Sequence, residues 1–351
     1  LFGRNATGGL VHYISRKPTF GEVEGFVDLR GGYYDTPAHG GSQRVEAAIG
    51  GPLGDRVAGR VAVMYDNVES YLKNMYPAGA PTAGSFGSLP PGPGAGADMG
   101  ASETFALRGT LDFKAGDEVL LRVSANHAKS KVSTGPYQAI STIGVLDAQG
   151  ELINVIRTPA GETRFTIQGS GEGGANLIDG SSFGSGGTLG LPGRPVPGGD
   201  FFGYTDPDGD GWRTSSDFAF KDNGETEATG LSGRVEWDVA ERVQLVSITD
   251  WKKYEKVLFI DVDAGPMNQL ANAGAVDADS LSQEVRLSGS TGRTHWVAGG
   301  YYLNIDNNAD NALKAPVNSL IYTLFGNTPF DIGVKARLKT KSYSAFGQLE
   351  F

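Results

Sequence analysis

The chain has 351 residues, no cysteine and a formal net charge of −10, with 53 glycines and 10% aromatic residues, which fits one large β domain or two ordinary domains. The acidic balance argues against a nucleic-acid partner, which needs a clustered basic face. Without cysteine there is no disulfide framework, thiolate metal site or cysteine nucleophile, and the four histidines leave no pair at metal-ligand spacing. We therefore expect a protein that is not an enzyme, and no run of about 18 apolar residues predicts a transmembrane helix.

The chain opens with a glycine-rich stretch, LFGRNATGGLVHYISRKP, over Leu1 to Pro18. Gly3 and Gly8 have the spacing of a phosphate-binding P-loop. However, Gly9 stands where the lysine of that motif must be, and no apolar strand comes before Gly3. A nucleotide site is therefore disfavoured. Asn5-Ala6-Thr7 also reads as a glycosylation sequon, without the secretory setting that such a site needs.

Apolar and polar residues alternate with period two along much of the chain. From Phe105 to Phe113 every odd position is apolar or glycine, whereas Arg108, Thr110 and Asp112 share the other face, which is the pattern of a strand with one apolar and one wet side. The pattern is weaker at 242–254, where two apolar residues fall on the polar face, and at 296–305. About ten stretches predict strands: 24–34, 43–50, 57–66, 105–113, 118–127, 231–239, 242–254, 281–288, 296–305 and 342–351.

Short and long connections between these stretches alternate along the chain. The short ones are 50–55, 114–117, 240–241 and 289–293, and the long ones lie near 68–102, 129–225, 255–279 and 306–338. This sorting is typical of antiparallel strands that cross a membrane, with short periplasmic turns and long external loops. Strands of nine to eleven residues also have the length to cross the hydrocarbon layer when tilted.

A sheet in lipid must close on itself, because every backbone polar group there has to be paired. We therefore expect the ten strands to belong to a larger barrel that continues outside the chain. A large soluble β protein, such as a propeller or a jelly roll, is the alternative for the alternation, but no blade-length repeat is found.

The opening stretch, which the predicted strands follow in the sequence, resembles the end of the plug domain in TonB-dependent outer-membrane receptors. In that family the plug ends in a segment very similar to Leu1 to Gly9, and an exit similar to Ile14 to Pro18 leads into the barrel. The glycines would let the last plug strand turn tightly, and the proline would mark the hinge. The plug-end motif consists of Gly3, Arg4, Asn5, Gly8 and Gly9. Three later stretches support the resemblance: Gly50 to Asp55, Ser282 to Ser288 and Ala345 to Leu349.

The resemblance implies an all-β fold, an antiparallel transmembrane β-barrel with long extracellular loops, of which the chain holds about ten of 22 strands. Residues 1–20 would be the end of the plug and the hinge, and residues 21–351 the N-terminal part of the barrel. The protein would be a monomeric outer-membrane importer of a bulky, scarce nutrient. A ferric siderophore is the favoured nutrient, and a glycan or cobalamin is the alternative. Its partners would be outer-membrane lipid and the TonB energy-coupling complex, the latter through an N-terminal region outside this chain. No cofactor is required.

An acidic loop carries the sharpest local motif, Asp206-Pro207-Asp208-Gly209-Asp210-Gly211, with Asp217 at the twelfth position. Alternating carboxylates before a glycine can direct several oxygens at a calcium ion, and the twelfth residue normally closes the coordination sphere. Here that residue is aspartate, which is shorter than the usual glutamate. A solvated acidic turn is therefore the alternative to a calcium site at Asp206, Asp208, Asp210 and Asp217.

Aromatic residues gather in the long connections, where they can stack on a ligand, belong to an aromatic girdle at the membrane surface or pack loop on loop. The candidates for ligand binding are Tyr71, Tyr76, Phe201, Phe202, Tyr204 and Trp212. Three tryptophans within the predicted strands are expected to face lipid or the girdle: Trp237, Trp251 and Trp296. Four arginines on the wet face are expected to form charge pairs with the plug or neighbouring strands: Arg60, Arg108, Arg122 and Arg234.

Two segments, Pro81 to Asp98 and Gly169 to Gly203, are rich in glycine, proline and serine, and we expect mobile loops that suit a gate over the barrel mouth.

Two other classes of protein stay open. A passive porin or adhesin-like barrel would lack the plug-end motif, and a soluble carbohydrate-binding β protein would bury both faces of its sheet.

Overall fold

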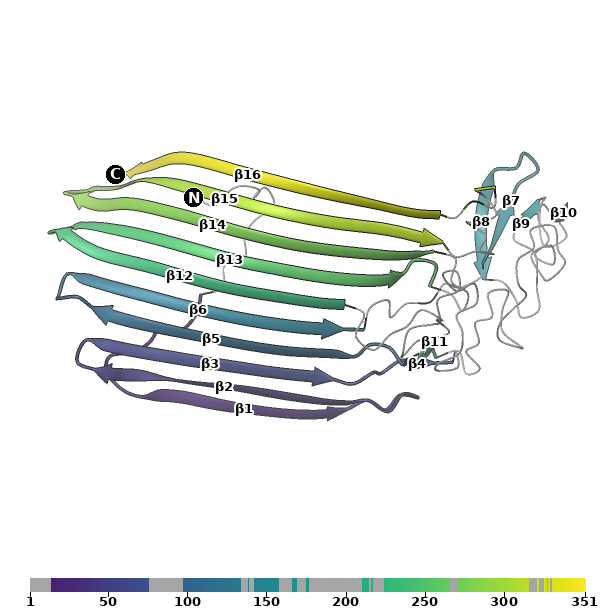
Figure 1. The fold of residues 1–351 in the computed structure, drawn as a ribbon, viewed down its shortest axis with the longest axis horizontal. Helices are drawn as coiled ribbons and strands as arrows, with labels where there is room; N and C mark the ends of the chain where they lie inside the picture. The colour runs from purple at the N-terminus through teal and green to yellow at the C-terminus, as the bar shows by residue number, and fades with distance from the viewer. Residues whose placement is uncertain are drawn as a thin grey trace.

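The computed structural model describes residues 14–75, 97–133, 138, 142–157, 166–168, 175–176, 210–214, 216, 224–264, 270–315, 321, 325–326, 328 and 330–351. Ten long strands dominate this part of the chain (Figure 1). They are β1 (Glu24–Tyr33), β2 (Gly41–Gly54), β3 (Val57–Val68), β5 (Ser102–Lys114), β6 (Val119–Val132), β12 (Gly224–Ala240), β13 (Val243–Asp261), β14 (Ala271–Thr291), β15 (Thr294–Ala315) and β16 (Phe330–Glu350). Each predicted stretch coincides with one of these strands to within one residue or lies inside it, so the prediction of ten strands is confirmed.

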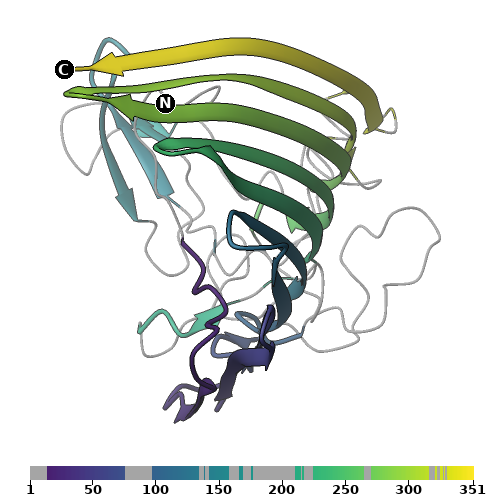
Figure 2. The same ribbon diagram turned by 90° about the vertical axis from the view of Figure 1, so that its left-hand side faces the viewer.

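The ten strands form one antiparallel sheet in which each strand pairs with its neighbours in chain order. Figure 2 shows that the sheet curves strongly and stays open, as the wall of a partial barrel. Within the described residues, the edge strands β1 and β16 are not paired with each other. The described start of the chain, ahead of β1, runs along the concave side of this wall (Figure 2).

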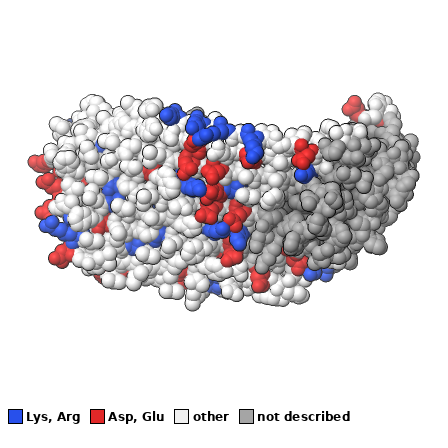
Figure 3. Space-filling model, viewed as in Figure 1, with Lys and Arg blue, Asp and Glu red and all other residues white. Residues whose placement is uncertain are grey.

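The two faces of the wall differ as the alternation predicts. Phe105, Leu107, Leu111 and Phe113 are 40 to 52% exposed, whereas Asp112, on the other face of the same strand, is 2% exposed. Figure 3 looks onto the convex face, which is largely uncharged between the short turns at one end and a stripe of charged residues further along the strands. The apolar side chains therefore point outward, and the polar ones line the concave side.

The predicted short turns join the strands at one end of the sheet. β5 and β6 are joined through residues 115–118, and β14 and β15 through only two residues. Gly116 and Gly292 have φ angles of +103° and +64°, a region that L side chains rarely adopt, which explains glycine at these turns. Short turns at one end and long connections at the other are thus a property of the fold.

The strands from β12 onward run far beyond the predicted limits, to between 17 and 22 residues. As a result, the expected long connections near 255–279 and 306–338 shorten to 262–270 and 316–329. On β12, β14 and β15 the extra length carries polar residues on both faces, so alternation fails there. On β16 alternation continues, with apolar Ile332, Val334 and Leu338 on one face and charged residues on the other. Cross-strand ion pairs hold the extra length together, such as Arg337 with Asp306 at 2.6 Å and Lys129 with Glu225 at 2.7 Å. The prediction of nine to eleven residues therefore covers only part of each of these strands.

Two smaller sheets lie at the long-connection end (Figure 1). One contains β7 (Thr142–Leu146), β8 (Leu152–Arg157), β9 (Thr166–Gln168) and β10 (Ala175–Asn176). The other joins β4 (Lys73–Asn74) to β11 (Arg213–Thr214) in parallel. The two segments predicted to be mobile lie outside the described residues, except for 97–98 and 175–176. No helix in the described part of the chain is long and apolar enough to cross a membrane.

Candidate ligand-binding wall and mouth

The concave wall carries a buried ion pair between two adjacent strands. Arg122 on β6 lies opposite Asp112 on β5, and its Nε donates to Asp112 Oδ1 at 2.7 Å while its Nη2 donates to Oδ2. The two side chains are 15% and 2% exposed. Such a pair fixes the relative position of the two side chains more than it adds net stability, because the cost of desolvating the charges offsets much of their attraction.

Further arginines of the wall are paired in a similar way. Arg60 lies 3.3 Å from Glu24 at the start of β1, and Arg234 bonds Glu236 on its own strand at 2.6 Å. The expected charge pairs with neighbouring strands are therefore confirmed for Arg60 and Arg122, whereas Arg234 pairs within its own strand. Arg108, the fourth, has no ion-pair partner within the described residues.

Hydroxyl groups fill the wall between the ion pairs. Thr110 and Ser124 share a buried hydrogen bond of 3.1 Å, and Thr104 bonds Ser130 at 2.9 Å. The wall is not polar throughout, since Val246 is 2% exposed on its inner face. The concave surface therefore combines paired charges and hydroxyls with apolar side chains, and it also presents the exposed Arg108.

At the mouth, Asn74 and Asp98 tie together three segments that are separated in the sequence. The Asn74 side chain donates to the backbone oxygen of Ser216 at 2.8 Å and accepts from its nitrogen at 3.1 Å. The Asp98 carboxylate accepts from the Asn74 nitrogen at 2.9 Å and from Lys73 Nζ at 3.1 Å. Leu72 and Met99 pack beneath as the small buried core of this region. We call this set of contacts, with the carboxylate of Asp261, the clasp.

Asp261 closes the clasp from the end of β13. Its carboxylate accepts from Ser216 Oγ at 2.9 Å and from the Ala264 nitrogen at 3.0 Å. The residue is only 5% exposed. Burial raises the pKa of Asp261 above its ordinary value, against the hydrogen bonds from Ser216, Ala264 and Asp263, which lower it. The protonated form therefore suits this position better than it suits an exposed aspartate.

Three aromatic rings meet beside the clasp. Tyr71 lies against Trp212 with ring centroids 6.4 Å apart in an edge-to-face arrangement, and against Tyr34 at 5.6 Å. Trp212 is 41% and Tyr34 37% exposed. We call these three residues the aromatic cluster. β11 lies on the concave side of the sheet in Figure 2 and at its long-connection end in Figure 1, so the cluster stands at that end of the concave side.

The structure brings together two of the six aromatic candidates, Tyr71 and Trp212. Tyr34 was missed, because it follows directly on a strand and not in a long connection; its place opposite the start of β2 is the signal that could have found it. The other four candidates lie outside the described residues: Tyr76, Phe201, Phe202 and Tyr204.

The acidic loop is described only in part. Asp210 Oδ1 accepts a hydrogen bond from the Trp212 nitrogen at 2.8 Å, which is a local turn contact. Asp206, Asp208 and Asp217 lie outside the described residues, as does the plug-end motif of Gly3, Arg4, Asn5, Gly8 and Gly9. Among the described residues, no group of three or more acidic or histidine side chains is placed to hold a metal ion. The calcium site stays a prediction.

The strand tryptophans lie on the convex face. Trp237 is opposite Leu245, Trp251 opposite Leu281, and Trp296 opposite Leu349. The Trp296 ring covers Gly289, where a Cβ atom would lie 2.8 Å from the ring. This outward placement agrees with the expected lipid-facing or girdle position.

No protein-family model and no curated protein matches the chain. Its fold matches solved structures, among them the ferric yersiniabactin uptake receptor FyuA from Yersinia pestis, with a TM-score of 0.50 and 12% identity over 95% of this chain and 45% of that chain. The ferric citrate transporter FecA, in its unliganded form, matches with a TM-score of 0.52 and 8% identity over 99% and 38%. The chain therefore spans less than half the length of either protein, and it has the barrel-wall fold that the resemblance to TonB-dependent receptors predicts.

Proposed function

We propose that the chain is the first part of the barrel of a TonB-dependent outer-membrane importer, with residues 1–20 as the end of the plug and the hinge. The observation that carries this proposal is the wall itself: ten antiparallel strands in chain order, apolar outside and polar inside, with short turns at one end and long connections at the other. Such a wall fits a bilayer, where apolar residues face lipid and closure satisfies the backbone. The fold shared with two iron-chelate uptake proteins supports it.

The aromatic cluster is the proposed site of first contact for a ferric siderophore. Tyr34, Tyr71 and Trp212 offer ring faces and edges on which a bulky chelate can stack. The ligand would then pass along the paired charges and hydroxyls of the concave wall. The TonB complex would drive the movement, and no covalent chemistry is required.

The charge at the mouth narrows the ligand class. The five connections at that end contain 15 acidic and 6 basic residues, so they hold most of the net charge of −10. A field of one sign attracts the opposite sign and repels its own over roughly 10 Å at ordinary salt. We therefore favour an electroneutral or cationic iron complex over a strongly anionic one.

The test uses the complete protein in a strain that lacks the chromosomal copy, with an electroneutral ferric hydroxamate as probe. Tyr71→Ala with Trp212→Ala is expected to weaken binding at least tenfold, since stacking on each ring is worth about 1 kcal/mol. Tyr343→Ala is the matched control, because Tyr343 is 74% exposed on the convex face. Equal binding by all three proteins would contradict the proposed site.

The same strain separates the importer from a passive porin. Import through the proposed protein should stop when an uncoupler collapses the proton-motive force, whereas passage through a porin would continue. Uptake that is indifferent to the uncoupler would overturn the proposal of energy-coupled transport.

A further inference from the structure

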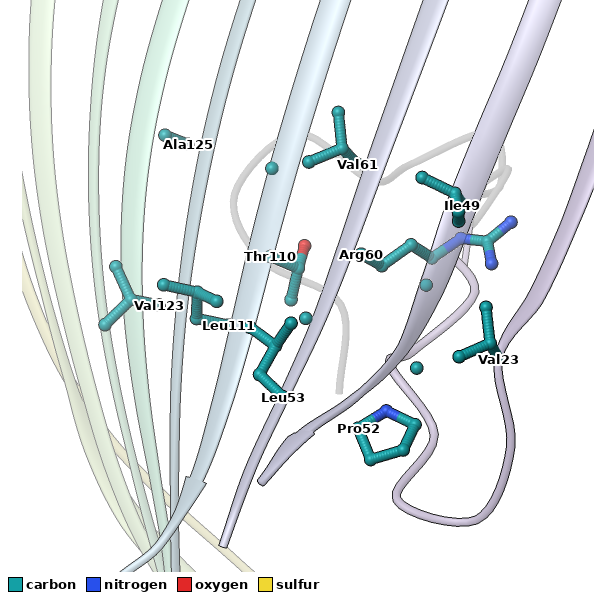
Figure 4. Close-up of a pocket in the computed structure, with 14 residues that line it drawn as sticks. Val23, Ile49, Pro52, Leu53, Arg60, Val61, Thr110, Leu111, Val123 and Ala125 are labelled. Carbon is teal, nitrogen blue, oxygen red and sulfur yellow. The ribbon is translucent and has the colours of Figure 1, made fainter. Parts of the chain in front are cut away.

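The convex face has a hollow of about 540 Å³ that crosses β2, β3, β5 and β6 near the short turns. Figure 4 shows the side chains around it, with Leu53 and Leu111 near its lower edge and Val61 near its upper edge. This volume is within the range of small-molecule pockets, about 300 to 1,000 Å³. The rest of the outer face need only be smooth to lie against lipid, so a hollow of this size calls for an occupant.

Small residues at one depth create the hollow. Gly109 on β5 lies between Val61 on β3 and Ala125 on β6, and all three point outward. A Cβ atom built on Gly109 would meet no atom within 4 Å. The floor is therefore backbone and one methyl group, and branched side chains such as Val123 form the walls.

The polar groups of the lining turn away from the hollow. The guanidinium of Arg60 lies 3.3 Å from Glu24 and is only 9% exposed, and Thr110 Oγ1 bonds Ser124 Oγ. Neither group is directed outward to receive a polar ligand. A sugar, a siderophore or a peptide would lose its hydrogen bonds to water there without replacement. Only an apolar occupant fits.

The depth of the hollow indicates what that occupant is. Gly109 lies five residues from Lys114 at the end of β5, which is about 17 Å along the strand and less in depth once the strand tilts. Half of the hydrocarbon core is about 15 Å thick. The hollow thus lies within the leaflet nearest the short turns, and the exposed Arg56, in the turn between β2 and β3, stands near the depth of the lipid phosphates.

We propose that this hollow holds one acyl chain of a phospholipid from the periplasmic leaflet, with the phosphate near Arg56. The inference rests on the proposed membrane location. A chain in the hollow contacts protein on several sides instead of one, and these dispersion contacts add up along its length. The bound phospholipid should therefore survive extraction that removes the other lipids of the outer face.

The test fills the hollow. Gly109→Phe places a ring in open space, and Gly300→Phe is the matched control, because Gly300 also points outward at a similar distance from the short turns and a Cβ atom there would make only an ordinary contact, 3.8 Å from Ser344 oxygen. The complete proteins are refolded into vesicles of phosphatidylethanolamine and phosphatidylglycerol, extracted in mild detergent and weighed by native mass spectrometry.

The wild type and Gly300→Phe are expected to retain one phospholipid that Gly109→Phe loses, with at least a tenfold drop in the bound fraction on lipid titration. Equal retention by all three proteins overturns the inference. In a second measurement, a photoreactive benzoylphenylalanine at Val123 of the otherwise unchanged protein should give an adduct with the mass of a phospholipid, and a protein adduct there overturns the inference. Failure of the wild type to insert into vesicles would instead refute the proposed membrane function, and this inference with it.

Discussion

Replacing Arg122 by methionine tests whether water is kept from the charge buried in the concave wall. The Asp112 side chain is 2% exposed and receives two hydrogen bonds from the guanidinium, whose own side chain is 15% exposed. Methionine occupies a similar volume but leaves the carboxylate without its counter-charge. Breaking a buried pair in this way costs about 3 to 5 kcal/mol. We expect Arg122→Met to lower the free energy of unfolding by that amount.

The double variant Asp112→Leu with Arg122→Met should recover most of the loss, because apolar residues often replace a buried pair at little cost. Arg30→Met is the matched control. Arg30 bonds Asp28 through the same two nitrogens, but the two side chains are 67% and 37% exposed, so little change is expected. The measurement is urea-induced unfolding of the complete protein in vesicles, followed by tryptophan fluorescence. An Arg122→Met protein as stable as Arg30→Met would refute the reasoning, since water would then reach Asp112.

Three other changes probe the clasp, the aromatic cluster and the lipid face. Burial raises the pKa of Asp261 above 3.8. The stability of the clasp should therefore be highest at low pH and fall as pH rises through the raised pKa. The measurement is hydrogen exchange of segment 210–216, in which Asp261→Asn should remove this pH dependence. Gly100→Ala should weaken ligand binding, because its Cβ would clash with a ring of the cluster, whereas Gly116→Ala, with a similar φ and open space, should leave binding unchanged. Leu107→Lys should destabilise the barrel by about 2 to 4 kcal/mol in vesicle refolding, and Ala106→Lys, which points inward, by much less.

The alternation predicts the fold well wherever the two faces meet different surroundings. On β5 one face is apolar and exposed and the other polar and buried, so periodicity alone identifies both the strand and its orientation. On the outer part of β15 this contrast disappears, since one face carries aspartate and asparagine and the other also carries asparagine, and the strand is held by backbone pairing and ion pairs. The sequence pattern ends there although the strand continues.

The candidate site is harder to predict, because its parts meet through very local contacts. Tyr71 and Trp212 stand 141 positions apart, and the parallel pairing of β4 with β11 that joins them involves two residues on each side. No periodicity exists in so short an element. Composition could single out aromatic residues in long connections, but only the bonds of Asn74 to Ser216 determine which of them meet.

The difference between the long strand pairing of the wall and the few side-chain bonds of the clasp indicates where movement can occur. Within the wall, a strand such as β14 pairs over 21 residues with β15 and over 19 with β13, so sliding it would break many backbone bonds at once. The clasp depends on a handful of side-chain bonds around Asn74, Asp98 and Asp261. A ligand can shift an equilibrium only by its difference in affinity for the two states, typically a few kcal/mol. That is enough to rearrange the clasp and too little to shear the wall, so a ligand bound at the proposed aromatic cluster would act on the connections at the mouth and not on the pairing of the wall.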